Sequence, residues 1–382
     1  MHKNTQKIYL DYSASAPLRP EAFEAMLKIL SLENAALNAS SIHSYGQEGR
    51  KIIEQAREKV AAFMGCDCNQ ITFTSGATES NNAVIRHFLE KFPDDMILIS
   101  NTEHPSILEF RKTYQTQVIP ACVEDNGLML PQTIDDICHD YGNISLVSVM
   151  LCNNESGILQ DIPALAEVAH KHGALFHCDA TQVSGCLPIE DLNADFVTIS
   201  SHKLGGPQGA GALVTKICGQ EPVALIGGGQ EKGLRAGTEN IAAIAGFGAA
   251  CKASAEDAGR NETLRQWRDE MERRLKEISP DIIIHGENVK RCATTSFFSM
   301  PSLKAQNMLM ALDVEGICIS NGSACSSGTV KPSAVLKSMG YSDDIAASAL
   351  RVSMGWATEK TDIDTFLEVW EKLVKRQSKK QE

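Results

Sequence analysis

The sequence has no long apolar run and no leader-like start. None of its uninterrupted hydrophobic stretches approaches the roughly 18 residues that a membrane-spanning helix needs. Residues 1–7 are polar and too few for a secretory signal peptide. We therefore expect a cytoplasmic protein that neither enters a membrane nor is secreted.

Positive charge is also scarce. The 382 residues include 36 Lys and Arg against 48 Asp and Glu, which gives a formal net charge of −12. An acidic chain repels the phosphates of nucleic acids unless its basic residues cluster. Here they are scattered as far as residues 372–380, a stretch that we interpret as a solvated C-terminal end. Direct binding to nucleic acid is not expected.

The twelve cysteines form no recognisable metal motif. No pair of CxxC motifs occurs, so a zinc ribbon or cluster cage is unsupported and we expect no bound metal. Cys66-Asp67-Cys68 is an alternative metal or redox site, although we favour two incidental loop thiols. Others, such as Cys152, lie in apolar runs where a thiol packs as a small hydrophobe. A reducing compartment suits such a chain.

Between about residues 50 and 215, short apolar runs alternate with helical patterns. The runs cover residues 71–74, 96–100, 146–151, 175–178 and 196–199. Strands that are apolar throughout and separated by helices predict an α/β fold, with a mainly parallel sheet covered by helices on both faces. In such sheets ligands bind where the strands end.

The pattern changes after about residue 215. Residues 264–275 carry Leu, Trp, Met and Leu at steps of three, four and four, which is one face of a long helix that ends before Pro280. This helix is expected to lead into a smaller α+β domain. We expect a large domain over residues 14–255, and a small domain formed by residues 1–13 and 256–382.

Two candidate catalytic residues directly follow predicted strands. Lys203 ends the segment Ser200-Ser201-His202-Lys203, where a lysine suits a Schiff base and the neighbouring Ser and His suit a phosphate. Asp179 is costly to bury unless it meets a cation, and a protonated pyridine nitrogen is one such partner. A solvated lysine and an N-cap aspartate are the alternatives.

Two further segments suit a phosphate and an aromatic ring. Ser75-Gly76-Ala77-Thr78-Glu79 opens a predicted helix, so its amides and the Thr78 hydroxyl could bind a phosphate, or it is an ordinary N-cap. His104 directly precedes Pro105, where an imidazole could stack on a ring or simply occupy a turn.

The last two candidates lie near the C-terminus. Cys325 is set among small polar residues in Asn321–Gly328, unlike the cysteines in apolar runs, so it could become a reactive thiolate or be an incidental loop thiol. Arg351 could grip a carboxylate through two hydrogen bonds or form a surface ion pair.

Together these segments resemble the cysteine desulfurases of fold-type I, in the class V aminotransferase superfamily of enzymes that use pyridoxal 5′-phosphate (PLP). The resemblance spans nearly the whole chain. It is carried by residues 9–14, 74–82, 102–104, 153–155, 179–182, 201–203, 235–240, 322–328 and 350–355. The cysteine segment 322–328 is similar to that of the NifS/IscS-like branch.

The resemblance implies roles around the cofactor ring. Lys203 would hold PLP and later move protons. Asp179 would pair with the pyridine nitrogen, Gln182 with the ring oxygen, and His104 would stack on the ring as a catalytic residue. Asn154 would contact both the cofactor and the substrate.

The resemblance also implies how the phosphate is held. Ala77 and Thr78 would bind it together with Ser200 and His202. Thr238 would reach the phosphate of the partner subunit's cofactor, which implies a homodimer.

Asn38 and Arg351 would orient the substrate, L-cysteine, with Arg351 on its carboxylate. Cys325 would attack the substrate sulfur and carry it as a persulfide, with L-alanine as the product. A sulfur-acceptor protein, such as an iron–sulfur scaffold or a thiolation enzyme, is the implied partner. Another class V PLP enzyme (an aminotransferase or selenocysteine lyase), a non-catalytic scaffold and a metal-binding protein remain alternatives.

Overall fold

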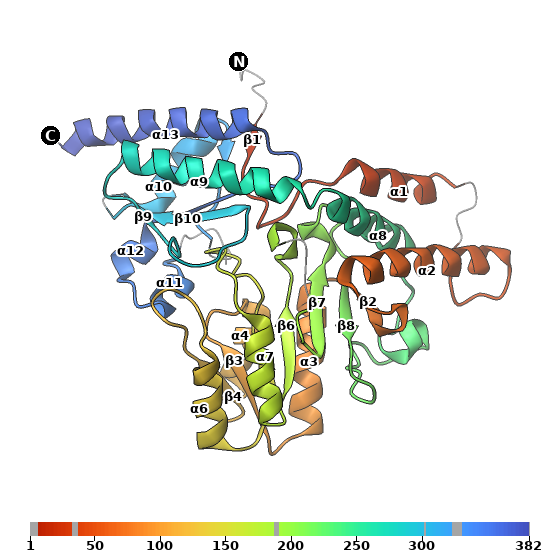
Figure 1. Cartoon of the computed structure of the whole chain (residues 1–382). Coiled ribbons are helices and arrows are strands. Elements are labelled where there is room, and N and C mark those ends of the chain that lie inside the picture. Colours follow the sequence, from red (N-terminus) through yellow and green to blue (C-terminus); the bar gives the residue numbers. More distant parts are fainter. Residues whose placement is uncertain (1–6, 33–36, 187–190, 302, 323–330, 382) are drawn as a thin grey trace.

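A seven-stranded sheet forms the centre of the molecule in the computed structural model, which describes residues 7–32, 37–186, 191–301, 303–322 and 331–381 (Figure 1). Its order is β2 (Ile71–Thr74), β8 (Gly211–Thr215), β7 (Phe196–Ser200), β6 (Leu175–Asp179), β5 (Ile144–Ser148), β3 (Met96–Ser100) and β4 (Val118–Ala121). The five strands from β7 to β4 pair in parallel, whereas β8 is antiparallel to both of its neighbours. The predicted mainly parallel sheet is confirmed.

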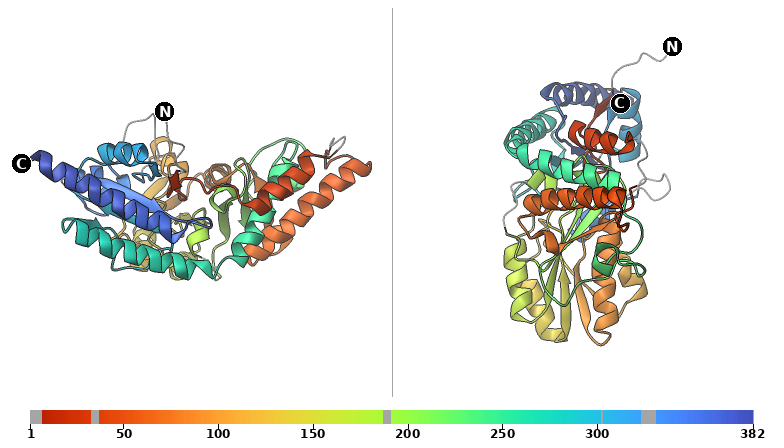
Figure 2. Two further views of the ribbon diagram at one scale, coloured as in Figure 1. Left: turned by 90° about the horizontal axis from the view of Figure 1, so that it is seen from above. Right: turned by 90° about the vertical axis from the view of Figure 1, so that its right-hand side faces the viewer.

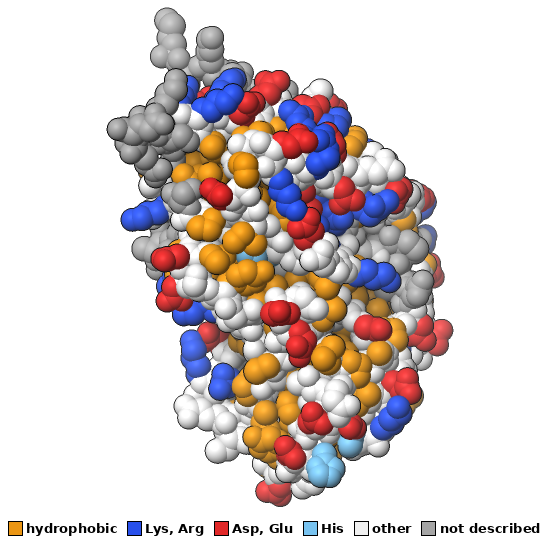
Figure 3. Space-filling view, turned by 60° about the vertical axis from the view of Figure 1, so that its left-hand side comes forward, with side chains coloured by type: hydrophobic (Ala, Val, Ile, Leu, Met, Phe, Trp, Pro, Cys, Tyr) orange, Lys and Arg blue, Asp and Glu red, His pale blue; other side chains and the backbone are white. Residues whose placement is uncertain are grey.

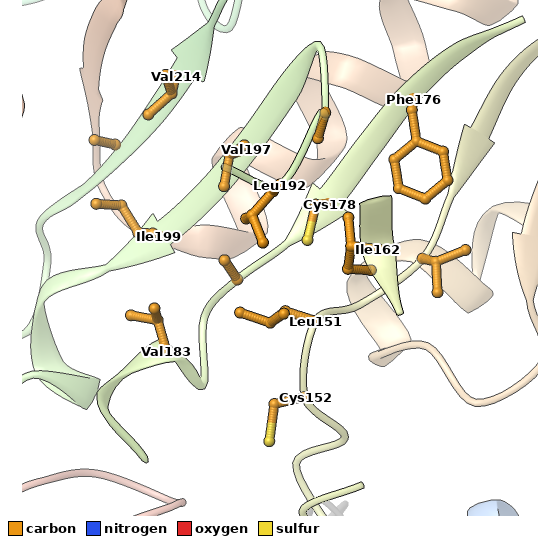
Figure 4. Packing of buried hydrophobic residues seen from close by; sticks show 14 of the residues in the cluster. Leu151, Cys152, Ile162, Phe176, Cys178, Val183, Leu192, Val197, Ile199 and Val214 are labelled. Atoms are coloured by element: carbon orange, nitrogen blue, oxygen red, sulfur yellow. The ribbon is translucent and has the colours of Figure 1, made fainter. Parts of the chain in front are cut away.

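Helices cover both faces of this sheet because its strands are apolar on both sides. On one face, α3 (Ala77–Lys91) packs its Phe88 against Ile97 and Ile99. On the other, Phe176, Cys178, Val197 and Ile199 face a core that includes Ile162 of α7 (Figure 4). The remaining helices around the sheet are α4 (Pro105–Leu108), α5 (Phe110–Thr113), α6 (Pro131–Tyr141) and α7 (Ile162–Lys171).

Three helices extend from one side of the sheet (Figure 2). They are α1 (Pro20–Leu30), α2 (Ser44–Met64) and α8 (Ile241–Glu256). Gly248 allows α8 to approach α2 closely, because a Cβ at this position would lie 2.8 Å from the Cα of Ala56. α8 is apolar on all sides because it is buried against the neighbouring helices α1 and α2.

The C-terminal part has its own core. A three-stranded antiparallel sheet is formed by β12 (Ala349–Ser353), β10 (Thr295–Ser299) and β9 (Ile283–Ile284), and a parallel pair by β1 (Ile8–Tyr9) and β11 (Ile317–Cys318). Its helices are α9 (Arg260–Ile278), α10 (Ala305–Val314), α11 (Ala334–Ser338), α12 (Asp343–Ala347) and α13 (Lys360–Gln381). The helix predicted before Pro280 is α9. The domain boundaries at 13/14 and 255/256 stay a prediction.

The chain also contains short 3₁₀ helices. One of them begins at Cys68, so that the segment Cys66-Asp67-Cys68 leads into it. The 3₁₀ helices are η1 (Cys68–Gln70), η2 (Val183–Cys186), η3 (Ser201–Lys203) and η4 (Gln230–Gly233). Asp67 and Gln70 form a reciprocal capping box around η1, so this segment has a structural role. Among the residues described, no group of three or more His, Cys, Asp and Glu side chains is arranged to hold a metal ion.

The surface in Figure 3 carries acidic and basic side chains intermixed, with hydrophobic groups between them. No helix in the described part of the chain is both long enough and apolar enough to cross a membrane.

Candidate active site

A pocket of about 630 Å³ opens at the carboxyl ends of the parallel strands. It brings together ten residues that the sequence analysis singled out. They are Ala77, Thr78, His104, Asn154, Asp179, Gln182, Ser200, His202, Lys203 and Arg351. The backbone after strands β3, β5, β6 and β7 supplies most of these residues, and Arg351 comes from β12 in the C-terminal part.

Lys203 lies in the tight connection that turns β7 back into the antiparallel strand β8. Burial, and next the charge of Arg351, lower the pKa of Lys203 to about 8. Its Nζ donates to the backbone oxygens of Ser13 and, at 2.9 Å, Ala14. A neutral amine is the nucleophilic form of lysine, so this environment prepares Lys203 to condense with an aldehyde.

Asp179 ends β6 and is buried, with both carboxylate oxygens hydrogen-bonded. The Thr181 amide donates to Oδ1 at 2.9 Å, and Asn81 Nδ2 donates to Oδ2 at 2.7 Å. These bonds fix the carboxylate in the pocket wall, where it can accept a bond from a protonated ring nitrogen.

His104 belongs to the same network. Asn81 Nδ2 also donates to Ser106 Oγ at 2.9 Å, and Ser106 Oγ lies 2.9 Å from His104 Nδ1. Because the Ser106 amide donates to Nδ1 as well, at 3.1 Å, the ring proton belongs on Nε2. Burial lowers the pKa of His104, which favours a neutral imidazole suited to stacking on a ring.

Asn81 was missed by the sequence analysis as a site residue, although it lies within the segment 74–82. Asn81 follows Ala77 by four residues and therefore lies on the buried side of α3. This position identifies Asn81 as a site residue only once Asp179 is known to lie opposite it.

Asn81→Ala is expected to weaken PLP binding about tenfold, because a hydrogen bond to a carboxylate contributes about 1.5–3 kcal/mol. Titration of the apo protein with PLP measures this change. Asn82→Ala is the matched control, since Asn82 Nδ2 donates to the Ser106 carbonyl and not to Asp179. Equal weakening in both variants would contradict a specific role for Asn81.

The start of α3, where the sequence analysis predicts a phosphate site, lines one part of the pocket. Gly76 has φ 152°, which disfavours a side chain, and a Cβ at Gly211 would lie 2.7 Å from the Cα of Gly76. This close approach sets the first amides of α3 beside Ser200 and His202. Burial, and next the charge of Lys203, lower the pKa of His202 to about 4, so it acts as a neutral hydrogen-bonding group.

The segment that contains Thr238 is anchored beside this turn. Arg235 Nε donates to Glu79 Oε1 at 2.9 Å, while the Ser75 amide donates to Glu79 Oε2 at 3.0 Å. Thr238 itself is exposed and does not line the pocket of this single chain. Asn38 is also exposed and outside the pocket, and its Oδ1 accepts a bond from the Ser40 amide at 3.0 Å.

Arg351 lines the pocket and is almost fully buried, with 3% of its surface exposed. Its Nη2 donates to Asp11 Oδ1 at 2.6 Å and its Nη1 to the Asn154 carbonyl at 2.7 Å. Its Nε is buried with no hydrogen-bond partner among the described residues. Asp11 is a second site residue that the sequence analysis missed. Its segment, residues 9–14, was noted only as part of the resemblance, and no role was assigned to Asp11.

Cys325 lies outside the described residues. On the N-terminal side of it, Gly322 lines the pocket, and on the other side Ser333 Oγ donates to Glu155 Oε2.

The comparisons with known proteins agree with this geometry. The aminotransferase class-V family model matches residues 8–366. Cysteine desulfurase IscS of Dictyoglomus turgidum is 34% identical, over 97% of this chain and 95% of that protein. The chain belongs to the cysteine desulfurases of this family. The crystal structure of a NifS-like protein from Rickettsia africae is similar to it with a TM-score of 0.88 and 34% identity, over 97% of this chain and all of that one.

A second solved structure, SspA in complex with cysteine, has 30% identity and a TM-score of 0.78, over 91% of this chain and 99% of that one. The fold predicted from the resemblance, fold-type I, is thereby confirmed. PLP is the cofactor of this family.

The residues present fit this cofactor. A partly buried lysine with a lowered pKa, a buried carboxylate and a helix N-terminus line one pocket, which matches an aldehyde, a ring nitrogen and a phosphate.

Proposed function

We propose that this chain removes sulfur from L-cysteine, releases L-alanine and retains the sulfur as a persulfide on Cys325. The observation that carries this proposal is the pocket that Lys203, Asp179 and Arg351 share. It offers one group for the cofactor's aldehyde, one for its ring nitrogen and one for a carboxylate that enters beside them.

In this proposal Lys203 would hold the cofactor through its amine and would act as the base that takes the proton from the substrate α-carbon. PLP supplies the electron sink that stabilises the resulting negative charge. Asp179 would keep the ring nitrogen protonated, and His104 would stack on the ring. The low pKa of Lys203 supports this assignment, because a general base acts best with a pKa close to the operating pH.

Arg351 would bind the substrate carboxylate. Its guanidinium lies in the pocket wall, where Asp11 accepts from Nη2 and the Asn154 carbonyl accepts from Nη1. Each of these nitrogens carries a second N–H, and the positive charge of the group suits a substrate carboxylate. Cysteine itself occupies the related SspA structure, which supports L-cysteine as the substrate.

The rate of PLP binding to the apo protein is expected to follow the titration of Lys203. Only the neutral amine condenses, so the rate should rise about tenfold per pH unit below about 8 and level off above it. Stopped-flow absorbance between pH 6.5 and 9.5 measures this. A rate that still climbs steeply at pH 9.5 would indicate an unperturbed lysine instead.

We also propose a homodimer. Large apolar side chains are exposed on α1 and just before it, around the start of α2 and in the segment before η4. They are Leu18, Phe23, Leu27, Leu30, Ile42, Tyr45, Val223, Leu225 and Ile226. A second copy over this face would cover them and bring Thr238 and Asn38 toward the partner's pocket.

The reaction is tested by incubating the PLP-loaded protein with L-cysteine. The expected products are alanine and a gain of about 32 Da on Cys325, the mass of one sulfur atom. Keto-acid consumption without that gain would identify an aminotransferase. Turnover of selenocysteine alone would identify a selenocysteine lyase.

The sulfur acceptor and the compartment belong to the same proposal. An iron–sulfur scaffold or a thiolation enzyme would take the persulfide sulfur. The eleven cysteines in the described part of the chain are free thiols, which suits a reducing cytoplasm.

A further inference from the structure

A short segment of the chain is bonded to the turn at the start of α3. This segment, residues 230–237, begins with η4 and ends one residue before Thr238. The turn, residues 75–78, lines the pocket where the sequence analysis predicts a phosphate site. We call residues 230–237 the supporting segment and residues 75–78 the phosphate turn.

Glu231 fixes one end of the supporting segment to the edge of the central sheet. Its Oε2 accepts from the Phe73 amide at 2.8 Å, and its Oε1 accepts from Arg57 Nη2 at 2.7 Å. Arg57 Nη1 donates to the Ile71 carbonyl at 2.9 Å, so the two side chains bond the open edge of β2 as a neighbouring strand would. Glu231 and Lys232 have φ of 44° and 59°, a conformation that costs free energy outside glycine and persists where the surroundings hold it.

Arg235 fixes the other end of the supporting segment to Glu79, in the first turn of α3. Its Nε donates to Glu79 Oε1 at 2.9 Å, and its Nη2 lies 3.4 Å from Glu79 Oε2. The Ser75 amide also donates to Oε2, at 3.0 Å. The side chains of Arg235 and Glu79 are only 22% and 15% exposed, so solvent screens their charges weakly.

Glu79 is charged in this arrangement. Burial raises the pKa of Glu79, but the bonds from Arg235 and Ser75 lower it by more, so the net shift is downward. The carboxylate lines the same pocket as Ala77 and Thr78. Because the first amides of a helix have no acceptor within it, Ala77 and Thr78 can donate theirs to a phosphate. An unpaired Glu79 would repel a phosphate dianion at that place.

We propose that Arg235 is a positioning residue for the cofactor phosphate: it cancels the charge of Glu79, so that Glu79 holds the Ser75 amide without repelling the phosphate. The supporting segment, fixed at Glu231, keeps Arg235 in place for this role. The inference rests on the phosphate site predicted at the start of α3. It assigns Arg235 a role within one subunit, separate from the contact of Thr238 with the partner subunit's cofactor.

PLP and pyridoxal, which lacks the phosphate, separate this role from a general effect on the fold. Each compound is titrated into the apo protein, with absorbance as the readout. Arg235→Ala should lower the affinity for PLP about tenfold to a hundredfold and leave the affinity for pyridoxal unchanged. An equal loss of affinity for both compounds would show a merely structural role and would overturn the proposal.

A second substitution distinguishes charge compensation from a displacement of Thr238. Adding Glu79→Gln to Arg235→Ala removes the unpaired charge, while a glutamine can still accept from the Ser75 amide. The double variant should therefore regain about tenfold in PLP affinity over Arg235→Ala. A displaced Thr238 would not be restored in this way, so a double variant that binds PLP no better than Arg235→Ala contradicts the proposal.

Glu54→Gln is the matched control for loss of a paired carboxylate. Glu54 Oε1 lies 3.1 Å from Arg57 Nε, but the side chain is exposed and does not line the pocket, so this variant should bind PLP as the wild-type protein does.

Thr78→Ala tests the phosphate site itself and should lose affinity for PLP but not for pyridoxal. If Thr78→Ala loses PLP affinity and Arg235→Ala does not, only the role of Arg235 is overturned. If neither variant changes PLP binding, that role is overturned together with the phosphate site on which it rests.

Discussion

Lys203→Ala is expected to lose the visible absorbance of bound PLP and to form alanine from cysteine at least about 10³-fold more slowly. The variant lacks both the amine that holds the cofactor and the base at the substrate α-carbon. Absorbance spectra and an alanine assay measure the two effects. Lys216→Ala is the matched control: Lys216 also follows a strand of the central sheet, but its Nζ pairs with Asp191 at 3.1 Å, and it does not line the pocket.

Misfolding would not explain this outcome. Burial holds the pKa of Lys203 at about 8, below its ordinary value of 10.5, so a charged Lys203 destabilises the folded apo protein at neutral pH. Lys203→Met should therefore unfold at a higher temperature than the wild-type apo protein at pH 7, and this gain should shrink as the pH rises from 8 toward 10.5. A Lys203 variant that retains PLP absorbance and normal turnover would contradict the assignment.

Cys325→Ala is expected to keep the PLP spectrum of the wild-type protein but to lose sulfur transfer by about 10²-fold or more. The thiol at this position is the proposed nucleophile toward the substrate sulfur, and the resemblance assigns it no role in holding the cofactor. Sulfide release in the presence of a reductant and mass analysis of the protein measure the loss. Cys218→Ala removes an exposed thiol elsewhere and should have no effect.

Normal sulfide release by Cys325→Ala would show that another group accepts the sulfur. Loss of PLP absorbance in the same variant would instead show that the residue supports the cofactor pocket. The outcome with Lys203→Ala differs from both, because there the cofactor is lost together with turnover.

The sequence alone predicted the elements that depend on local periodicity. The apolar runs became β2, β3, β5, β6 and β7, and the helical spacing over 264–275 became part of α9. Local composition also placed Asp179 and Lys203 at strand ends. The carboxyl ends of parallel strands lie at one edge of a sheet, so the fold class already predicts that Asp179 and Lys203 lie near each other.

Other parts of the site depended on contacts that no local pattern contains. Asp11 and Arg351 are 340 positions apart, and Asn81 and Asp179 are 98 apart. Asp11 and Asn81 lie in segments that carry the resemblance, but nothing in those segments shows which residue either of them contacts. Asp11 meets Arg351 only because the C-terminal part packs over the sheet. Asn81 meets Asp179 only because α3 packs on β6.

Composition and spacing therefore predicted the class of fold, and the motifs that resemble the cysteine desulfurases predicted the family and the candidate cofactor residues. The tertiary structure decided how those residues are held: the bonds to Asp179 and the lowered pKa of Lys203. The physical reason is that secondary structure follows from neighbours along the chain, whereas burial, charge and hydrogen bonding at a site follow from neighbours in space.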